Sequence, residues 1–321
     1  MNAAFGTVFG AAASAIAAVF AVIVGAGLLV RRGVITQPQI DALSSATVNI
    51  LLPCLIFAKV TETLDPASQP GWWALPIVGI AMALVGTGLG ALVFARGLPE
   101  KRNLLPLAGM QNAGYLVLPV GLALYPDSFD AFALYVFLFI LGYNPVLWSL
   151  GKVLISGSRD QPFLWRDLVT PPLLANLVAI AASLSGAAEL LPRPFVVAVD
   201  LVGSAAVPVA LLVLGAVLGS VAISLRLHLG DALRAMSVKL MLLPALTTVV
   251  VVLSGLPEVN PLLAEFLIIE AASAPPVAVV LQARTYGGDD RTIGSIMVLS
   301  YAACALSLPA WIAAWRILAV G

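Results

Sequence analysis

Long apolar runs alternate with short polar segments along the whole chain. Each run has about 20 residues, the length that a helix needs to cross the hydrocarbon core of a bilayer. Since lipid offers the backbone no hydrogen-bond partners, continuous helices are expected throughout. The pattern predicts an all-α membrane protein with ten spans, near residues 8–30, 40–60, 72–95, 104–125, 130–156, 168–187, 195–220, 235–255, 262–283 and 293–318.

Composition supports an integral membrane protein. Of the 321 residues, 61% are hydrophobic and 10% are charged, and the mean hydropathy is +1.06. Soluble domains have roughly 45–50% apolar and about 25% charged residues. Arg31 and Arg32 follow the first apolar run, whereas a signal peptide has its basic residues ahead of its apolar stretch. The first run is therefore expected to be a retained helix.

Lysine and arginine are distributed unevenly between the predicted loops. Loops after even-numbered spans contain only Lys59 and Arg193. Because cytoplasmic loops are enriched in Lys and Arg, this bias places the odd loops in the cytoplasm and both termini outside, in a multi-pass protein of the inner (plasma) membrane. Loops after odd-numbered spans contain Arg31, Arg32, Arg96, Lys101, Arg102, Lys152, Arg159, Arg166, Arg226, Arg234, Lys239, Arg284 and Arg291.

Prolines recur at matching places in the two halves of the chain. Pro53 and Pro119 are 66 residues apart, in spans two and four, and Pro208 and Pro275 are 67 apart, in spans seven and nine. Prolines are common in membrane helices, so chance is the alternative explanation. We interpret the spacing as an internal repeat.

The repeat predicts two inverted five-helix halves, residues 1–160 and 161–321. Five spans are an odd number, so the second half enters the membrane from the opposite side. Inverted repeats with interrupted helices at matching positions indicate a transport site near the middle of the bilayer. Spans four and nine are expected to be the broken, crossing helices.

Glu270 lies in the middle of the ninth apolar run. A charge at this depth is costly and normally faces a protein interior or a wet cavity on an ion or substrate path. Pro275 and Pro276 follow and are expected to break the helix. The alternative for Glu270 is a protonated acid that is hydrogen-bonded to a carbonyl.

The predicted crossing of the two broken helices offers binding groups for both an anion and a cation. Each helix that resumes after Pro119 or Pro275 starts with unpaired N–H groups and a partial positive charge, which favour an anion such as a carboxylate. The opposed helix ends offer carbonyl groups to a hard cation, with Glu270 supplying the negative charge. We therefore expect Glu270 to bind the coupling ion, either sodium or a proton.

Four segments resemble the auxin efflux carrier family. They are NILLPCLIF (49–57), QNAGYLVLPVGLALY (111–125), IIEAASAPPVAVVLQARTYGGDD (268–290) and SLPAWI (307–312). The family includes plant auxin carriers and bacterial carriers often described as malonate or malate transporters, and it is grouped with the sodium-coupled bile acid transporters.

The resemblance implies an elevator-type transporter. Spans one, two, six and seven would form a scaffold that dimerises, and spans three to five and eight to ten would form a moving transport domain. The chain differs from many members in having Ala274 before Pro275 and Pro276. Glu270 stands where bile acid transporters have a sodium-binding glutamate, which favours cation coupling.

The candidate substrate-binding residues are polar side chains beside the predicted interruptions or on neighbouring scaffold spans. Asn112 is expected to donate to a substrate carboxylate, the alternative being a hydrogen bond between helices. The full set is Gln111, Asn112, Tyr115, Ser273, Asn49 and Ser204, with helix breaks at Pro53, Pro119, Pro208, Pro275 and Pro276.

Three classes of function fit a polytopic membrane protein. An intramembrane enzyme needs a nucleophile with a base or a metal pair at membrane depth, and neither is evident. A channel favours rings of charge or a carbonyl filter, which the pattern also lacks. A secondary carrier of small organic anions remains, with an uncoupled uniporter or a sodium-coupled bile-acid-type symporter as alternatives. No GxxxxGK[ST] loop occurs, so ATP is not expected to drive transport. We also expect no organic cofactor and no nucleic-acid partner.

Overall fold

The protein is described by a computed structural model over residues 2–156, 168–222 and 229–320. Within these ranges it is all-helical and has no strand, as the apolar pattern predicts. Eight helical stretches are long and apolar enough to cross a membrane. They are Phe5–Arg31, Gln37–Thr63, Ala74–Val93, Leu98–Leu124, Pro126–Ser156, Arg193–Ser220, Leu229–Leu253 and Asp290–Ala319.

The chain order of the α-helices follows the predicted runs. They are α1 (Asn2–Arg31), α2 (Gln37–Ala46), α3 (Leu52–Thr63), α4 (Ala74–Val93), α5 (Leu98–Lys101), α6 (Leu105–Gly109), α7 (Leu118–Leu124), α8 (Phe129–Val146), α9 (Lys152–Ser156), α10 (Pro171–Ser185), α11 (Arg193–Ser204), α12 (Ala206–Ser220), α13 (Leu229–Ser237), α14 (Leu243–Leu253), α15 (Leu256–Val259), α16 (Pro261–Ala272), α17 (Ala278–Tyr286) and α18 (Asp290–Val320).

Two further segments are apolar but short. Helix α10 is a shorter apolar helix, and α16 and α17 are separated by an interruption. The predicted number of ten spans requires that α10 and the α16–α17 pair each cross the membrane as well. That number therefore stays a prediction.

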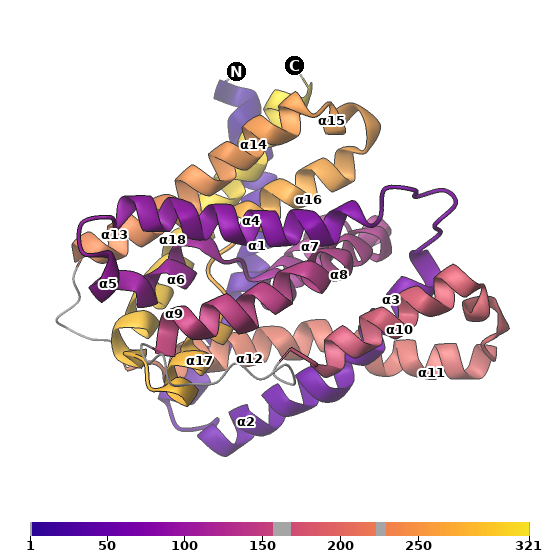
Figure 1. Ribbon diagram of the computed structural model, residues 1–321, viewed down its shortest axis with the longest axis horizontal. Coiled ribbons are helices and arrows are strands. Elements are labelled where there is room, and N and C mark those ends of the chain that lie inside the picture. Colours follow the sequence, from indigo (N-terminus) through magenta and orange to yellow (C-terminus); the bar gives the residue numbers. More distant parts are fainter. Residues whose placement is uncertain (1, 157–167, 223–228, 321) are drawn as a thin grey trace.

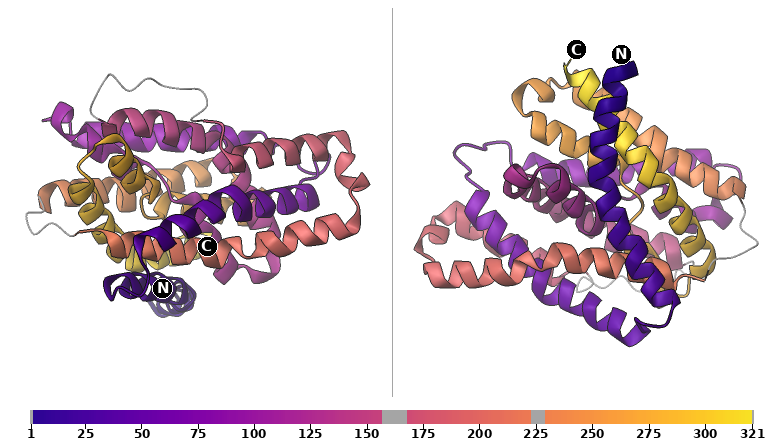
Figure 2. Two further views of the ribbon diagram at one scale, coloured as in Figure 1. Left: turned by 90° about the horizontal axis from the view of Figure 1, so that it is seen from below. Right: turned by 180° about the vertical axis from the view of Figure 1, so that it is seen from behind.

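The helices form two groups. Figure 1 shows α2, α3, α10, α11 and α12 gathered along one edge of the molecule and α4, α13, α14 and α16 toward the opposite edge, with α8 between them. Helix α1 packs against α12 and α18 and crosses the back of the molecule, as Figure 2 shows. The two chain ends lie near each other (Figure 1).

Three prolines stand just after a π-helical turn rather than at a break. The π segments η1 (Thr47–Leu51), η3 (Ala113–Val117) and η8 (Val238–Leu242) each end shortly before the proline of the next helix, at Pro53, Pro119 and Pro244. Proline lacks an N–H and clashes with the carbonyl one turn back, and a widened turn accommodates this. A continuous helical stretch therefore passes through Pro53, where a break is predicted.

Pro208 also lies inside a helix, in the first turn of α12. A single residue, Ala205, separates the end of α11 from the start of α12. A proline in a first helical turn is well tolerated because its missing N–H has no partner there anyway. The predictions of breaks at Pro53 and Pro208 are therefore wrong, the first outright and the second by a few residues.

Glycines allow close helix contacts near the centre of the fold. A Cβ atom on Gly109 would collide with the backbone of Gly86 and Thr87 in α4, and one on Gly142 would collide with the backbone of Pro76. Small residues at such contacts are typical of membrane helix packing. The contact at Gly109 fixes the end of α6, where the first chain interruption begins.

Candidate site at the two interrupted helices

The first interruption separates α6 from the π segment η3. Helix α6 ends at Gly109, Met110 is extended, and helical geometry resumes at Ala113. Pro119 lies beyond this point, in the first turn of α7. The prediction that Pro119 breaks the helix is thus wrong in position, because the π turn of η3 accommodates this proline.

The second interruption separates α16 from α17. Helix α16 ends at Ala272, and α17 begins at Ala278. Pro275 and Pro276 lie in the intervening stretch, where the sequence predicts them. Two consecutive residues without N–H groups cannot continue the hydrogen-bond ladder of α16.

The two interruptions contact each other directly. The backbone N–H of Asn112 donates to Oγ of Ser273 over 3.4 Å, and the Asn112 side chain donates to the hydroxyl of Tyr301. That hydroxyl in turn donates to the carbonyl of Pro275 over 3.1 Å. Ser273 also donates to the carbonyl of Glu270 over 2.8 Å. Two segments far apart in the sequence are therefore joined at their breaks.

A cavity of about 120 Å³ lies beside this junction. Both helix starts line it, through Ala113 and Gly114 on one side and Val277 and Ala278 on the other. The first N–H groups of a helix have no acceptor in a preceding turn and carry a partial positive charge. The remaining wall is mainly apolar and includes Val48, Leu52, Ile56, Phe137, Ile140, Leu147 and Trp148.

Gln111 lies beside this cavity and is fully buried. Its backbone is held by Tyr143, whose hydroxyl donates to the Gln111 carbonyl over 2.6 Å and accepts from the Gln111 N–H over 3.1 Å. The side-chain Nε2 donates to Gly109 over 2.8 Å. Among the described residues, Oε1 of Gln111 has no hydrogen-bond partner although it is buried. A buried acceptor of this kind is costly unless a ligand or water supplies a donor.

Asn112 lines the cavity, but both ends of its side chain have protein partners. Its Oδ1 accepts from the N–H of Tyr115 over 3.3 Å, which caps η3, and its Nδ2 donates to Tyr301. These contacts match the alternative interpretation, a hydrogen bond between helices. Tyr115 also lines the cavity and is largely buried. Ser273 is fully buried behind the cavity and links the two interruptions.

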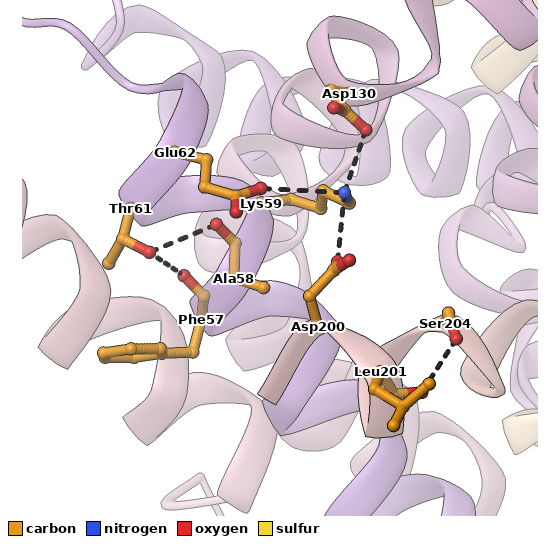
Figure 3. Close-up of polar contacts among 9 residues, drawn as sticks. All are labelled: Phe57, Ala58, Lys59, Thr61, Glu62, Asp130, Asp200, Leu201 and Ser204. Atoms are coloured by element: carbon orange, nitrogen blue, oxygen red, sulfur yellow. Dashed lines mark hydrogen bonds and ion pairs between the residues drawn. The ribbon is translucent and has the colours of Figure 1, made fainter. Parts of the chain in front are cut away.

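The structure does not bring Asn49 and Ser204 to the cavity. Asn49 is exposed on η1 and donates to Ser45 over 3.0 Å. Ser204 is exposed at the end of α11 and donates to the carbonyl of Leu201 over 2.8 Å, as Figure 3 shows. Their side chains satisfy local partners, so the prediction that they line the cavity is wrong.

Lys59 forms a cluster that joins three helices. Its Nζ lies 3.1 Å from Asp130 at the start of α8, 3.1 Å from Asp200 of α11 and 3.7 Å from Glu62 (Figure 3). The lysine side chain is 13% exposed, whereas the three acids are more exposed. The sequence assigns Lys59 to a loop, and the structure instead places it within α3, near the end of that helix.

Glu270 is fully buried in α16, as expected for an acid that faces the protein interior. Neither of its carboxylate oxygens has a hydrogen-bond partner among the described residues. Lys239 is also fully buried, and its Nζ donates to the carbonyl of Ala271 over 2.7 Å. The lysine and glutamate attract each other electrostatically without a direct hydrogen bond.

Sequence reasoning missed Lys239, which it assigned to a cytoplasmic loop. The residue lies in η8, inside the spanning stretch Leu229–Leu253, and it also falls within the predicted span 235–255. The signal was available, since Lys239 is the only charged residue between Ala235 and Val252. A lone cation in an apolar run indicates a buried site as much as a lone acid does.

Comparison with known proteins identifies the family. The family model described as membrane transport protein matches the chain twice, over residues 11–162 and 160–312. The chain belongs to this family of membrane transporters. The resemblance to auxin efflux carriers is thereby confirmed.

A curated relative of this membrane transport protein is described as an uncharacterised transporter from Methanothermobacter thermautotrophicus. It is 26% identical over 162 residues, which cover 48% of this chain and 51% of the relative. The aligned part of the chain thus spans about half the length of that relative, and the match adds no substrate.

Proposed function

We propose that this membrane transport protein is a secondary carrier of small carboxylates. The observation that supports it best is the pair of helix starts, at Ala113 and Ala278, that line one cavity. Helix N-termini favour anions, and burial strengthens the interaction. Malonate, malate and auxin-like acids are the candidate substrates from the family resemblance.

The cavity wall favours an acid that also has an apolar part. Leu52, Phe137 and Trp148 belong, with the two helix starts, to the set of residues that lines the cavity. Ligand sites of this kind are mostly apolar, with a few polar groups that orient the ligand. Oε1 of Gln111 supplies an acceptor for a hydroxyl or N–H donor on that ligand.

We propose ten spans in two inverted halves that work by an elevator mechanism. The family model matches each half separately, at residues 11–162 and 160–312, which supports this arrangement. The helix contacts agree with it: α1 packs on α12 as α10 packs on α3, and α4 packs on α6 as α14 packs on α16. Under this proposal the scaffold contains α1, α2, α3, α10, α11 and α12.

Coupling to a cation gradient is proposed to depend on Glu270. The buried carboxylate without a hydrogen bond is the observation that supports this role. The second candidate is an uncoupled uniporter, which is favoured by the neighbouring charge of Lys239, since a permanently compensated acid needs no mobile ion.

A transport assay in proteoliposomes tests the proposal. A carrier exchanges labelled carboxylate for unlabelled carboxylate from the opposite side, whereas a channel gives no such counterflow. Glu270→Gln is expected to abolish gradient-driven accumulation, and Glu265→Gln is the matched control, because Glu265 lies on the same helix in an ion pair with Arg316. Accumulation by Glu270→Gln at the wild-type level and with wild-type ion dependence would refute the coupling role.

We further propose a homodimer in the inner (plasma) membrane with both termini outside the cytoplasm. The family resemblance supports the dimer, and the Lys and Arg distribution supports the orientation. The nearby chain ends in Figure 1 agree with an even number of spans. Accessibility of a terminal tag to a membrane-impermeant reagent in intact cells tests the orientation.

A further inference from the structure

The end of α16 offers the carbonyl groups that a hard cation needs, and each already has a protein donor. Ser273 donates to the carbonyl of Glu270, Lys239 donates to that of Ala271, and Sγ of Cys304 lies 3.7 Å from that of Ala272. Hard cations require several oxygen ligands at once. No group of three or more acidic, histidine or cysteine side chains that fits a metal occurs in the described ranges.

Lys239 occupies the position where a bound cation is expected. Its ammonium lies at the C-terminal end of α16, where the helix dipole favours positive charge, and it attracts the carboxylate of Glu270. A sodium ion beside Glu270 would have to displace this ammonium from the Ala271 carbonyl or tolerate its repulsion. The surroundings of Glu270 therefore do not fit sodium while Lys239 is in place.

The local fold directs Lys239 into the core. Pro244 follows the widened turn η8, which carries Lys239. The indole N–H of Trp311 in α18 donates to the carbonyl of Leu240 over 2.8 Å and anchors this turn. Leu240 and Pro244 both follow Lys239 in the chain, so these contacts hold the turn that carries Lys239 from its C-terminal side.

We propose that Lys239 is a tethered cation that takes the place of a metal ion beside Glu270, so that the carrier is independent of sodium. The inference rests on the proposed function only in treating the protein as a carrier, and it leaves the proton as the cation that Glu270 can couple. Removing the ammonium leaves a carboxylate, a free carbonyl at Ala271 and an unfilled space, and these create a sodium site that the wild-type protein lacks.

Thermal unfolding of the purified full-length protein in lipid nanodiscs tests the inference. Midpoints are compared in sodium chloride and choline chloride at equal ionic strength for wild type, Lys239→Ala and Lys239→Ala/Glu270→Gln. We expect no sodium-specific shift for wild type and a rise of about 2–4 °C for Lys239→Ala at saturating sodium. The double variant is expected to lose that rise.

The control is Lys152→Ala, which removes another buried lysine, one that lies over the ring of Tyr286 at 4.7 Å. It is expected to gain no sodium response. A sodium-specific rise of the unfolding midpoint in wild type that Glu270→Gln removes would overturn the inference. So would a folded Lys239→Ala variant whose unfolding midpoint is the same in sodium chloride and choline chloride. If Lys239→Ala fails to fold, the inference requires that Lys239→Ala/Glu270→Gln folds, and failure of both overturns it.

This readout is independent of carboxylate transport. If the unfolding midpoints respond to sodium as expected but no carboxylate is exchanged in proteoliposomes, the proposed function fails and the inference about Lys239 stands. If carboxylate is exchanged but wild type binds sodium at Glu270, the inference fails and the carrier stands.

Discussion

Tyr143 is expected to hold the first helix interruption in place through two hydrogen bonds to the backbone of Gln111. Its hydroxyl accepts from the Gln111 N–H over 3.1 Å and donates to the Gln111 carbonyl over 2.6 Å. Tyr143→Phe removes only this hydroxyl, and the ring keeps its stacking on Phe139 at 5.7 Å between centroids. Two buried backbone groups then lose their partner.

The cost follows from those two groups. Each unsatisfied buried backbone group costs about 1–3 kcal/mol, and water that enters from the neighbouring cavity recovers part of it. We expect a net loss of about 2 kcal/mol, which corresponds to a fall of about 4 °C in the unfolding midpoint. Because Gln111 precedes the helix start that lines the cavity, carboxylate affinity is expected to fall about tenfold.

The matched control is Tyr135→Phe on the same helix. Its hydroxyl accepts from Nδ2 of Asn260 over 2.8 Å, and neither residue lines the cavity. Unfolding midpoints in nanodiscs and carboxylate binding by thermal shift are measured for both variants. If Tyr143→Phe binds carboxylate as tightly as Tyr135→Phe, the hydroxyl does not organise the site.

The remaining predictions concern three other contacts. Asn112→Ala removes a helix cap and is expected to cost about 1 kcal/mol in thermal unfolding and to weaken carboxylate binding; wild-type affinity would exclude it from the site. Gly109→Ala forces α6 away from α4 and is expected to cost about 1–3 kcal/mol, whereas Gly88→Ala, which faces open space, is neutral in the same melt. Lys59→Met breaks the link from α3 to Asp130 and is expected to lower the midpoint by about 2 °C or less at low salt; equal midpoints at low and high salt for wild type would show that the cluster contributes nothing.

The sequence predicted the elements that depend on composition and periodicity. The apolar runs, the buried position of Glu270 and the interruption at Pro275 and Pro276 agree with the structure. Two consecutive prolines leave the backbone no helical alternative, so this break is readable locally.

The effect of the other prolines on their helices could not be predicted from the local sequence. A single proline such as Pro53 or Pro119 follows a widened turn in a continuous helical segment. The first interruption instead depends on Asn112, which caps the next helix, and on the glycine contact that ends α6. An asparagine cap can be read locally, but the glycine contact is tertiary and has no local sequence signal.

The positions of individual side chains relative to one another and to the cavity were the least predictable part of the site. Lys239 and Glu270 are on different spans, and their proximity depends on how η8 and α16 pack. Asn49 has the same residue type as Asn112, yet it is exposed, whereas Val48 and Leu52 of the same helical stretch line the cavity.

The most direct test of the account is the structure of the protein in lipid nanodiscs with a transported carboxylate bound. We expect the carboxylate oxygens to lie within about 3 Å of the backbone N–H groups at the two helix starts, those of Gly114 and Ala278. A carboxylate bound elsewhere, such as in the space between α1, α12 and α18, would contradict it.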